Sequence, residues 1–248
     1  MQILENILSD NDVVVLKEYW EKNNHLTYKN AFTKEDHPWR DRSDFIDSRL
    51  LIVEGTKAWD IIRRVVDSVD PSSPPMWANY QRQSICHQLH VDEYGKDRGP
   101  DQQTFTIIFA LEDQPKFKTV VFKELANDGD EMEQLLYKIP YHQPRKNNSS
   151  KEHDLDHMNK LVYGRNHNYC DWLTLDGVFA YLKGWGVMFD TNQLHSTSNW
   201  CKYPEFTHRD LVQVHFGYNA GALSETHFTQ GRGEAPPEDG HLRQMVKD

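Results

Sequence analysis

The order of hydrophobic and polar positions predicts two helices near the start of the chain. Residues 10–24, DNDVVVLKEYWEKNN, begin with capping residues and continue as a helix of about three turns. Thr56 precedes a second helical stretch at 57–70, in which apolar residues recur at helical spacing. The prolines within 71–75 end this second helix because proline cannot continue the helical hydrogen-bond pattern.

Beyond residue 76 the pattern changes to short alternating or apolar segments, which are typical of strands. A run of short strands without a βαβ alternation predicts an all-β sandwich or barrel rather than a Rossmann-type sheet. LLIVEG at 50–55 is a further short strand, and the polar segment 31–49 before it is expected to be a loop. The main strands are expected at 77–92, 104–111, 119–125, 178–190 with a break at its glycines, and 209–218.

The strands and helices suggest one domain over residues 1–248. Residues 1–76 form an N-terminal helical support region, and residues 77–218 form the β core. Residues 126–172 interrupt the strands with a long polar segment, which we interpret as an insertion that acts as a lid or binding loop. Residues 219–248 are expected to be a C-terminal extension.

Composition narrows the classes of function. The chain has 28 Lys and Arg against 38 Asp and Glu, a formal net charge of −10, which disfavours binding to nucleic acid or to anionic membranes. No apolar run reaches the roughly 18 residues of a membrane-spanning helix, and the first residues do not resemble a secretory signal. The three cysteines form no even framework, so we expect reduced thiols and a cytoplasmic location.

The most informative local motif is His90-Val91-Asp92. In a strand, residues two apart point to the same face, so an imidazole and a carboxylate would lie side by side. If 77–92 is one unbroken strand, His90 and Asp92 share a polar face with Tyr80 and Arg82. An isolated pair of this kind is most often a surface feature, so it needs support from elsewhere in the chain.

That support comes from two residues far along the sequence. His195 follows the apolar segment GWGVMFDTNQL and is placed to complete a triad of two histidines and one carboxylate. Such a triad leaves metal positions open for a cosubstrate and dioxygen. Arg209 opens the last strand, on a face with Leu211 and Gln213, where its planar guanidinium suits the capture of a carboxylate.

Taken together, the HxD pair, the distal histidine and the following arginine resemble the iron(II)- and 2-oxoglutarate-dependent dioxygenase superfamily over residues 77–218. The segment GWGVMFDTNQLHST is similar to the strand that leads to the distal histidine of that family, and HVDEYG resembles its prolyl-hydroxylase-like and phytanoyl-type branches. Prolyl hydroxylase relatives usually have a lysine where this chain has Glu205, and this departure argues against a close match to that branch.

The resemblance implies a double-stranded β-helix, the cupin-like jelly roll, with flanking helices. It also implies that iron(II) is held by His90, Asp92 and His195 and that the far carboxylate of 2-oxoglutarate pairs with Arg209. The implied reaction couples decarboxylation of 2-oxoglutarate, with dioxygen, to hydroxylation of a small-molecule or peptidyl substrate. Because Asp92 is a carboxylate rather than the small residue of related halogenases, hydroxylation is the expected outcome.

Alternative interpretations remain at the sequence level. The same three ligands suit a cupin-like metal protein with a hydrolytic, isomerising or binding-only role, and an interaction domain with a decayed metal site is a third reading. His153 and His157 are four apart on a predicted helix but lack the rest of a zinc motif. If Arg209 does not bind the cosubstrate, Lys202 and Arg82 are the next candidates.

Overall fold

The computed structural model describes residues 1–29, 47–73, 75–83, 89–92, 104–126, 173–198 and 208–217. The predicted insertion at 126–172, apart from Ala126, and the predicted extension at 219–248 lie outside the described residues. His153, His157 and Lys202 lie there too, so the expectations for them stay predictions.

Two helices and ten strands, with one short 3-10 turn at Asn24–Leu26, make up the described part of the chain. The helices are α1 (Asp10–Asn23) and α2 (Lys57–Val69). The strands are β1 (Gln2–Leu4), β2 (Tyr28–Lys29), β3 (Asp47–Leu51), β4 (Pro75–Gln83), β5 (Thr104–Ala110), β6 (Gln114–Leu125), β7 (Leu175–Tyr181), β8 (Gly186–Asp190), β9 (Gln193–Thr197) and β10 (Arg209–Gly217).

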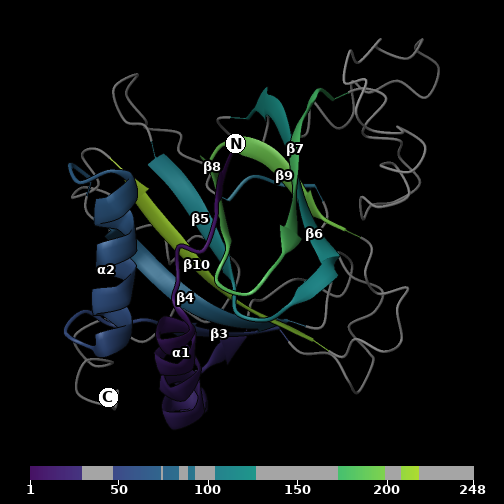
Figure 1. Cartoon of the computed structure of the whole chain (residues 1–248). Coiled ribbons are helices and arrows are strands. Elements are labelled where there is room, and N and C mark those ends of the chain that lie inside the picture. Colours follow the sequence, from purple (N-terminus) through teal and green to yellow (C-terminus); the bar gives the residue numbers. More distant parts are fainter. Residues whose placement is uncertain are drawn as a thin grey trace.

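The strands form two sheets that face each other, with the helices to one side (Figure 1). The large sheet has the order β1-β8-β5-β10-β4-β3-β2, and the small sheet has the order β7-β6-β9. An isolated antiparallel bridge between His90 and His195 adds a further chain segment beside β9. From β4 to β10 the chain passes back and forth between the sheets, which is the winding of a double-stranded β-helix. The predicted fold class is confirmed.

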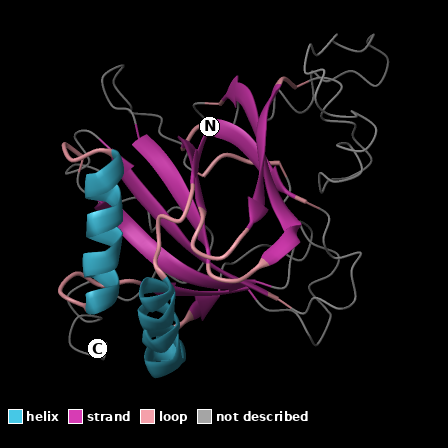
Figure 2. Ribbon diagram, in the orientation of Figure 1, coloured by secondary structure: helices cyan, strands magenta, loops and turns pink. Residues whose placement is uncertain are grey.

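Both helices cover the outer face of the large sheet (Figure 2). Helix α2 begins as predicted, because the side chain of Thr56 accepts a hydrogen bond from the Trp59 amide at 3.2 Å. Helix α1 begins at Asp10, so the residues expected to cap it, Asp10 to Asp12, form its first turn instead. Its N-cap is Ser9, whose hydroxyl accepts from the Asp12 amide at 3.2 Å while the Asp12 carboxylate accepts from the Ser9 amide at 2.8 Å.

The apolar core has two layers. One lies between the helices and the large sheet and contains Leu16 and Ile62 from the helices with Val212 and Val214 from β10. The other lies between the two sheets and contains residues such as Leu211. Neighbouring residues of β10 therefore alternate between the layers, as the sequence pattern predicted.

The prediction of one unbroken strand over 77–92 is wrong. Strand β4 ends at Gln83, and His90 pairs with the other sheet. The predicted faces are wrong for the same reason, since Tyr80 points to the helices and stacks on Trp20 with ring centroids 4.7 Å apart. Gln81 and Gln83 are the β4 side chains that lie on the side of His90.

Two smaller expectations also need correction. The segment 31–49 is not all loop, because β3 begins at Asp47. Residues 193–197 form β9, although their sequence QLHST has little of the apolar pattern by which strands were recognised. All five are buried, and β9 lies between β6 and the added segment at 89–92, so burial was not signalled by hydrophobicity.

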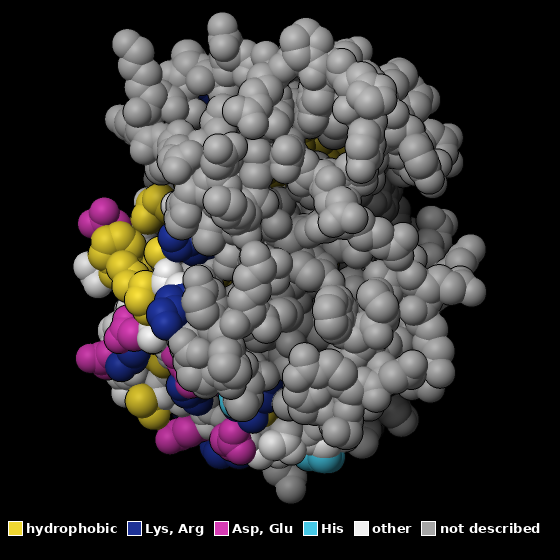
Figure 3. Space-filling model, turned by 90° about the vertical axis from the view of Figure 1, so that its right-hand side faces the viewer, with side chains coloured by type: hydrophobic (Ala, Val, Ile, Leu, Met, Phe, Trp, Pro, Cys, Tyr) yellow, Lys and Arg dark blue, Asp and Glu magenta, His cyan; other side chains and the backbone are white. Residues whose placement is uncertain are grey.

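No helix among the described residues is long and apolar enough to cross a membrane. Where Figure 3 shows described side chains, lysine and arginine lie among aspartate and glutamate, with hydrophobic side chains between them. In this part of the surface, no large area carries charges of one sign only.

Candidate metal centre and its cavity

The backbone brings His90 and Asp92 against β9, although about a hundred positions of sequence separate them from it. His90 and His195 exchange two backbone hydrogen bonds of 2.9 Å, and the Asp92 amide donates to the Thr191 carbonyl at 3.1 Å. These bonds fix the stretch 89–92 as an added segment at the edge of the small sheet. The HxD pair and the distal histidine therefore lie together, as the sequence predicted.

The three side chains converge on one point. Oδ1 of Asp92 lies 3.4 Å from Nε2 of His195 and 3.7 Å from Nε2 of His90, and one ligand atom from each residue lies within 4.8 Å of the others. Two ligands about 2.1 Å from one ion and at right angles to each other lie about 3 Å apart. The spacing thus fits three adjacent ligands of a single metal ion.

Hydrogen bonds orient these groups for metal binding. The ring nitrogen Nδ1 of His195 lies 2.9 Å from the Gln193 carbonyl, to which it donates, so Nε2 is directed at Asp92. The second carboxylate oxygen of Asp92 is buried and has no hydrogen-bond partner among the described residues. Because a buried oxygen without a partner is unfavourable, this donor set fits a bound cation.

The charges of the triad depend on one another. Burial alone would raise the pKa of Asp92, but the neighbouring imidazoles of His195, His215 and His90 outweigh burial and hold that pKa well below its usual range. Burial alone would lower the pKa of His195, but the Asp92 carboxylate and the Gln193 carbonyl raise it. The site therefore keeps an ionised carboxylate, which is the form that binds metal.

Arg209 is buried in the same region, with 3% of its surface exposed. Its Nη1 donates to the hydroxyl of Tyr181 at 2.8 Å, and its Nε and Nη2 donate to Oε1 of Gln83 at 3.2 and 2.9 Å. Its guanidinium carbon also lies 5.1 Å from the centre of the Tyr181 ring. No carboxylate pairs with Arg209 among the described residues, so a charged group is buried beside neutral partners only.

One cavity joins the triad to Arg209. The free space among its side chains is about 40 Å³. Its wall contains His90, Asp92, His195 and Arg209 together with the polar residues Arg49, Gln81, Gln83 and Gln213.

The sequence did not assign Gln83 and Tyr181 to Arg209. Tyr181 belongs to no metal-binding or cosubstrate motif of the sequence, and the assumption of one unbroken strand over 77–92 implied for Gln83 the face opposite His90. Arg82, the alternative cation, lies on the outer side of the large sheet. There its Nε and Nη2 bind both carboxylate oxygens of Asp210, at 2.8 and 2.7 Å.

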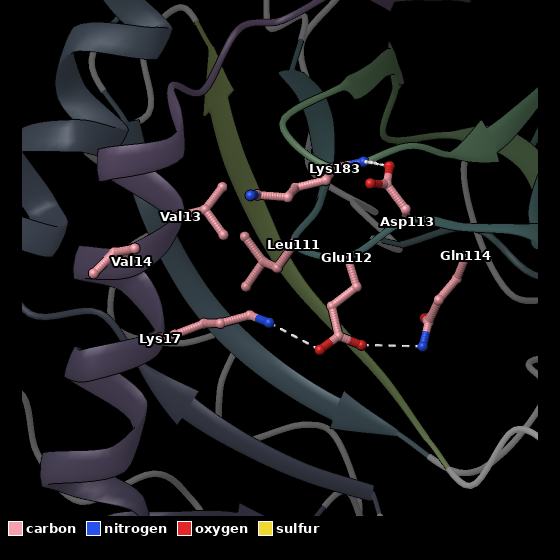
Figure 4. Close-up of a pocket in the computed structure, with 8 residues that line it drawn as sticks. All are labelled: Val13, Val14, Lys17, Leu111, Glu112, Asp113, Gln114 and Lys183. Carbon is pink, nitrogen blue, oxygen red and sulfur yellow. Dashed lines mark hydrogen bonds and ion pairs between the residues drawn. The ribbon is translucent and has the colours of Figure 1, made fainter.

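A second, wider hollow lies between α1 and the turn from β5 to β6 (Figure 4). It is open to the surface, and Lys17 crosses it to bind Glu112 at 2.8 Å. Apolar Val13 and Leu111 form part of its wall. It contains no cluster of metal ligands among the described residues, so the buried cavity is the better candidate for chemistry.

Comparison with known proteins supports the fold. No family model matches the sequence, and no curated protein is similar to it in sequence. The structure resembles the non-heme alpha ketoglutarate dependent epimerase SnoN from nogalamycin biosynthesis, with a TM-score of 0.50 at 10% identity over 96% of this chain and 86% of SnoN. SnoN in complex with Fe3+, alpha ketoglutarate and nogalamycin RO gives a TM-score of 0.51 at 11% identity, over 95% of this chain and 87% of SnoN.

The chain has the fold of SnoN. The resemblance to the iron(II)- and 2-oxoglutarate-dependent superfamily is thereby confirmed for the fold. A prolyl-4-hydroxylase from Pseudomonas putida is also similar, with a TM-score of 0.47 at 9% identity over 87% of this chain and 90% of that one, but a likeness at this level adds nothing to the comparison with SnoN.

Proposed function

We propose that the chain is an iron(II)- and 2-oxoglutarate-dependent oxygenase that hydroxylates its substrate. The observation that supports this most strongly is that one cavity contains both a triad of two histidines and one carboxylate and a buried arginine without an acidic partner among the described residues. The first is the donor set of non-haem iron(II) oxygenases. The second provides a binding group for the cosubstrate.

The triad would hold the metal through Nε2 of His90, Nε2 of His195 and the carboxylate of Asp92. Iron(II), when bound, supplies the chemistry that couples dioxygen and 2-oxoglutarate to the oxidation of a C–H bond. The chain contributes ligand orientation, because the Gln193 carbonyl fixes the His195 ring and the bridge to β9 fixes the backbone of His90.

Arg209 would bind the far carboxylate of 2-oxoglutarate. A guanidinium has five N–H donors, and Gln83 and Tyr181 take three of them, so two remain for a carboxylate. The hydroxyl of Tyr181 also lies 3.0 Å from Oγ1 of Thr119, another residue of the cavity wall. An incoming carboxylate would thus bind a guanidinium that neutral neighbours hold in place.

The ligand set supports hydroxylation over halogenation. Asp92 contributes a carboxylate to the third protein position, so no protein ligand is replaced by an exogenous halide. Small molecules and peptides are both included in the proposal as classes of substrate. We also propose a cytoplasmic location, on the basis of the three cysteines without an even pairing framework.

A succinate assay with and without candidate substrates tests this function. The wild-type protein should release succinate only with iron(II), 2-oxoglutarate and dioxygen together, and a hydroxylated product should gain one oxygen atom in mass. His90→Ala, Asp92→Ala and His195→Ala should each abolish stoichiometric iron binding and keep the fold. Iron binding without any 2-oxoglutarate turnover would instead favour a cupin-like metal protein that is not an oxygenase.

A further inference from the structure

One short turn carries the chain from the large sheet to the small sheet beside the metal ligands. It spans residues 190–193, from the end of β8 to the start of β9, and we call it the ligand turn. Two of its backbone carbonyls bind residues of the triad. The Thr191 carbonyl accepts from the Asp92 amide at 3.1 Å, and the Gln193 carbonyl accepts from Nδ1 of His195 at 2.9 Å. The ligand turn therefore contacts two of the three candidate metal ligands.

The side chain of Gln193 links the ligand turn to three other parts of the chain. Its Nε2 donates to the Phe122 carbonyl on β6 and to the Asp176 carboxylate on β7, each at 2.9 Å. Its Oε1 accepts from the Asp190 amide at 3.2 Å. Gln193 is 8% exposed, and both ends of its carboxamide are bound, so the side chain is fixed in one orientation.

An irregularity in the small sheet explains the place of this side chain. Val121 pairs with His195, but the next pair is Leu125 with Gln193, so β6 advances four residues while β9 advances two. Such an irregularity leaves backbone groups of the longer strand without ladder partners. The Phe122 carbonyl lies within it, and the Gln193 carboxamide supplies a hydrogen bond that joins β9 to β6 where the backbone pairing is interrupted.

The other half of the ligand turn is held to the large sheet. The amide and the hydroxyl of Thr191 both donate to the carbonyl of Thr104 on β5, each at 3.1 Å, and the two hydroxyls bind each other. Both threonines are fully buried. A shift of the Thr191 carbonyl, which binds the Asp92 amide, would break these bonds. The ligand turn is thus anchored to both sheets at once.

We infer that Gln193 is a positioning residue of the metal centre, whose side chain holds the ligand turn in the conformation that directs His195 at the metal. The group that binds Nδ1 of a metal-bound imidazole sets the orientation of the ring. Here that group is a backbone carbonyl, and the anchored side chain of the same residue sets its direction. The inference rests on the proposed function for the metal, and it assigns a role to a residue outside the described cavity wall.

The test is a titration with Co(II), whose visible absorption reports the arrangement of its ligands. Gln193→Met keeps the length of the side chain and removes its three hydrogen bonds. The dissociation constant for Co(II) should rise at least about tenfold, and the visible spectrum should change. Both are measured at a temperature at which circular dichroism shows the variant to be folded, where a loss of stability alone would leave them unchanged.

Two further variants complete the experiment. Gln114→Met is the matched control, because it removes a carboxamide that binds the Glu112 side chain at 3.0 Å and the His208 carbonyl at 3.3 Å, away from the triad. It should leave the affinity and the spectrum as they are. Thr191→Val keeps the branched shape and removes the hydroxyl that binds Thr104, so it should weaken Co(II) binding by a smaller factor.

A folded Gln193→Met protein with the wild-type affinity and spectrum would overturn the inference, since Gln193 would then have a structural role only. If Gln193→Met does not fold, unchanged Co(II) binding in Thr191→Val overturns it instead. An equal loss in Gln114→Met would also contradict it. A wild-type protein that binds Co(II) but not 2-oxoglutarate would contradict the proposed oxygenase and leave this comparison decisive, whereas one that binds no Co(II) would contradict both.

Discussion

The guanidinium of Arg209 is buried with neutral partners only, among the described residues, and this determines what it can bind. A buried charge is unfavourable unless it is paired, so the site gains stability when a carboxylate enters. Gln83 and Tyr181 hold the group in place without neutralising it. Arg209 is thus fixed in position by its partners and keeps its charge for binding a carboxylate.

Replacing Arg209 should affect the cosubstrate and leave the metal unchanged. Arg209→Ala should weaken 2-oxoglutarate binding roughly 30-fold to several-thousand-fold, because it leaves a carboxylate unpaired in the cavity. Arg209→Lys should be intermediate, since the charge remains and the planar fork is lost. Calorimetry of both variants measures this, with the exposed Arg63→Ala as the control. An unchanged affinity in Arg209→Ala would remove Arg209 from the site.

Gln83 offers a complementary test of the same site. Gln83→Glu would place a carboxylate beside Arg209, where it competes with 2-oxoglutarate, and should weaken the cosubstrate about tenfold or more. Gln83→Met removes the same hydrogen bonds without adding a charge and should change the affinity far less. Equal effects of the two substitutions on the dissociation constant would show that competition for Arg209 is not the cause.

The sequence predicted the triad and Arg209 because each depends on residue type and on order along the chain. It could not predict the partners of Arg209. An alternation counted back from His90 implies the opposite face for Gln83, because it assumes a continuous strand, whereas β4 and His90 belong to different sheets. When the chain leaves one sheet and joins another, the alternation of side chains between faces starts anew, and the local sequence pattern does not show where this happens.

At the scale of elements, each side of the large sheet has its own polar network. On the inner side Arg209 binds Gln83, which donates to Gln81, and on the outer side Arg82 and the hydroxyl of Tyr80 bind the buried carboxylate of Asp210. Arg209 and Asp210 are neighbours in β10, so consecutive residues serve opposite faces of one strand. The inner network serves the cavity, and the outer network anchors the sheet beneath the helices.

The outer network should matter for stability alone. Arg82→Ala leaves Asp210 buried with only Tyr80 as a described donor, so the free energy of unfolding should fall by about 3 kcal/mol. Urea unfolding measures this change, and calorimetry of the folded variant should show an unaltered affinity for 2-oxoglutarate. A large loss of that affinity in a stable Arg82→Ala protein would place Arg82 in the site after all.

Helix α1 depends on its capping box. Ser9→Ala removes the hydroxyl that accepts from the Asp12 amide and should lower the free energy of unfolding by about 1 kcal/mol. Metal affinity should stay constant, because α1 packs on the face of the sheet opposite the cavity. Ser68→Ala, in the last turn of α2, changes a serine that caps no helix start and should cost less. A shift in metal affinity would contradict the separation of the two layers.

The strands were predicted unevenly for a physical reason. Strands β5, β8 and β10 have apolar residues on at least one face, and the sequence located them. Strand β9, with its sequence QLHST, lines a polar cavity, so its burial is not accompanied by hydrophobicity. The element that presents the distal histidine is therefore the one that the hydrophobic pattern was least able to reveal.

At the scale of the whole molecule, the two-sheet winding explains why the site has the composition it does. The winding brings His90, His195 and Arg209 from distant parts of the chain to the walls of one cavity. The helices and the outer layer support the large sheet and leave its inner face for binding. Ligands that bind only this folded cavity should stabilise the whole domain.

The most direct test of the central claim is an anaerobic calorimetric titration of 2-oxoglutarate into the protein with and without iron(II). We expect one molecule of 2-oxoglutarate to bind per chain, tightly only when iron(II) is present. His195→Ala should lose iron binding and, with it, the tight binding of 2-oxoglutarate. Arg209→Ala should keep iron binding and lose affinity for 2-oxoglutarate only. Binding of 2-oxoglutarate that is absent, or that is equally strong without metal and in His195→Ala, would contradict the account.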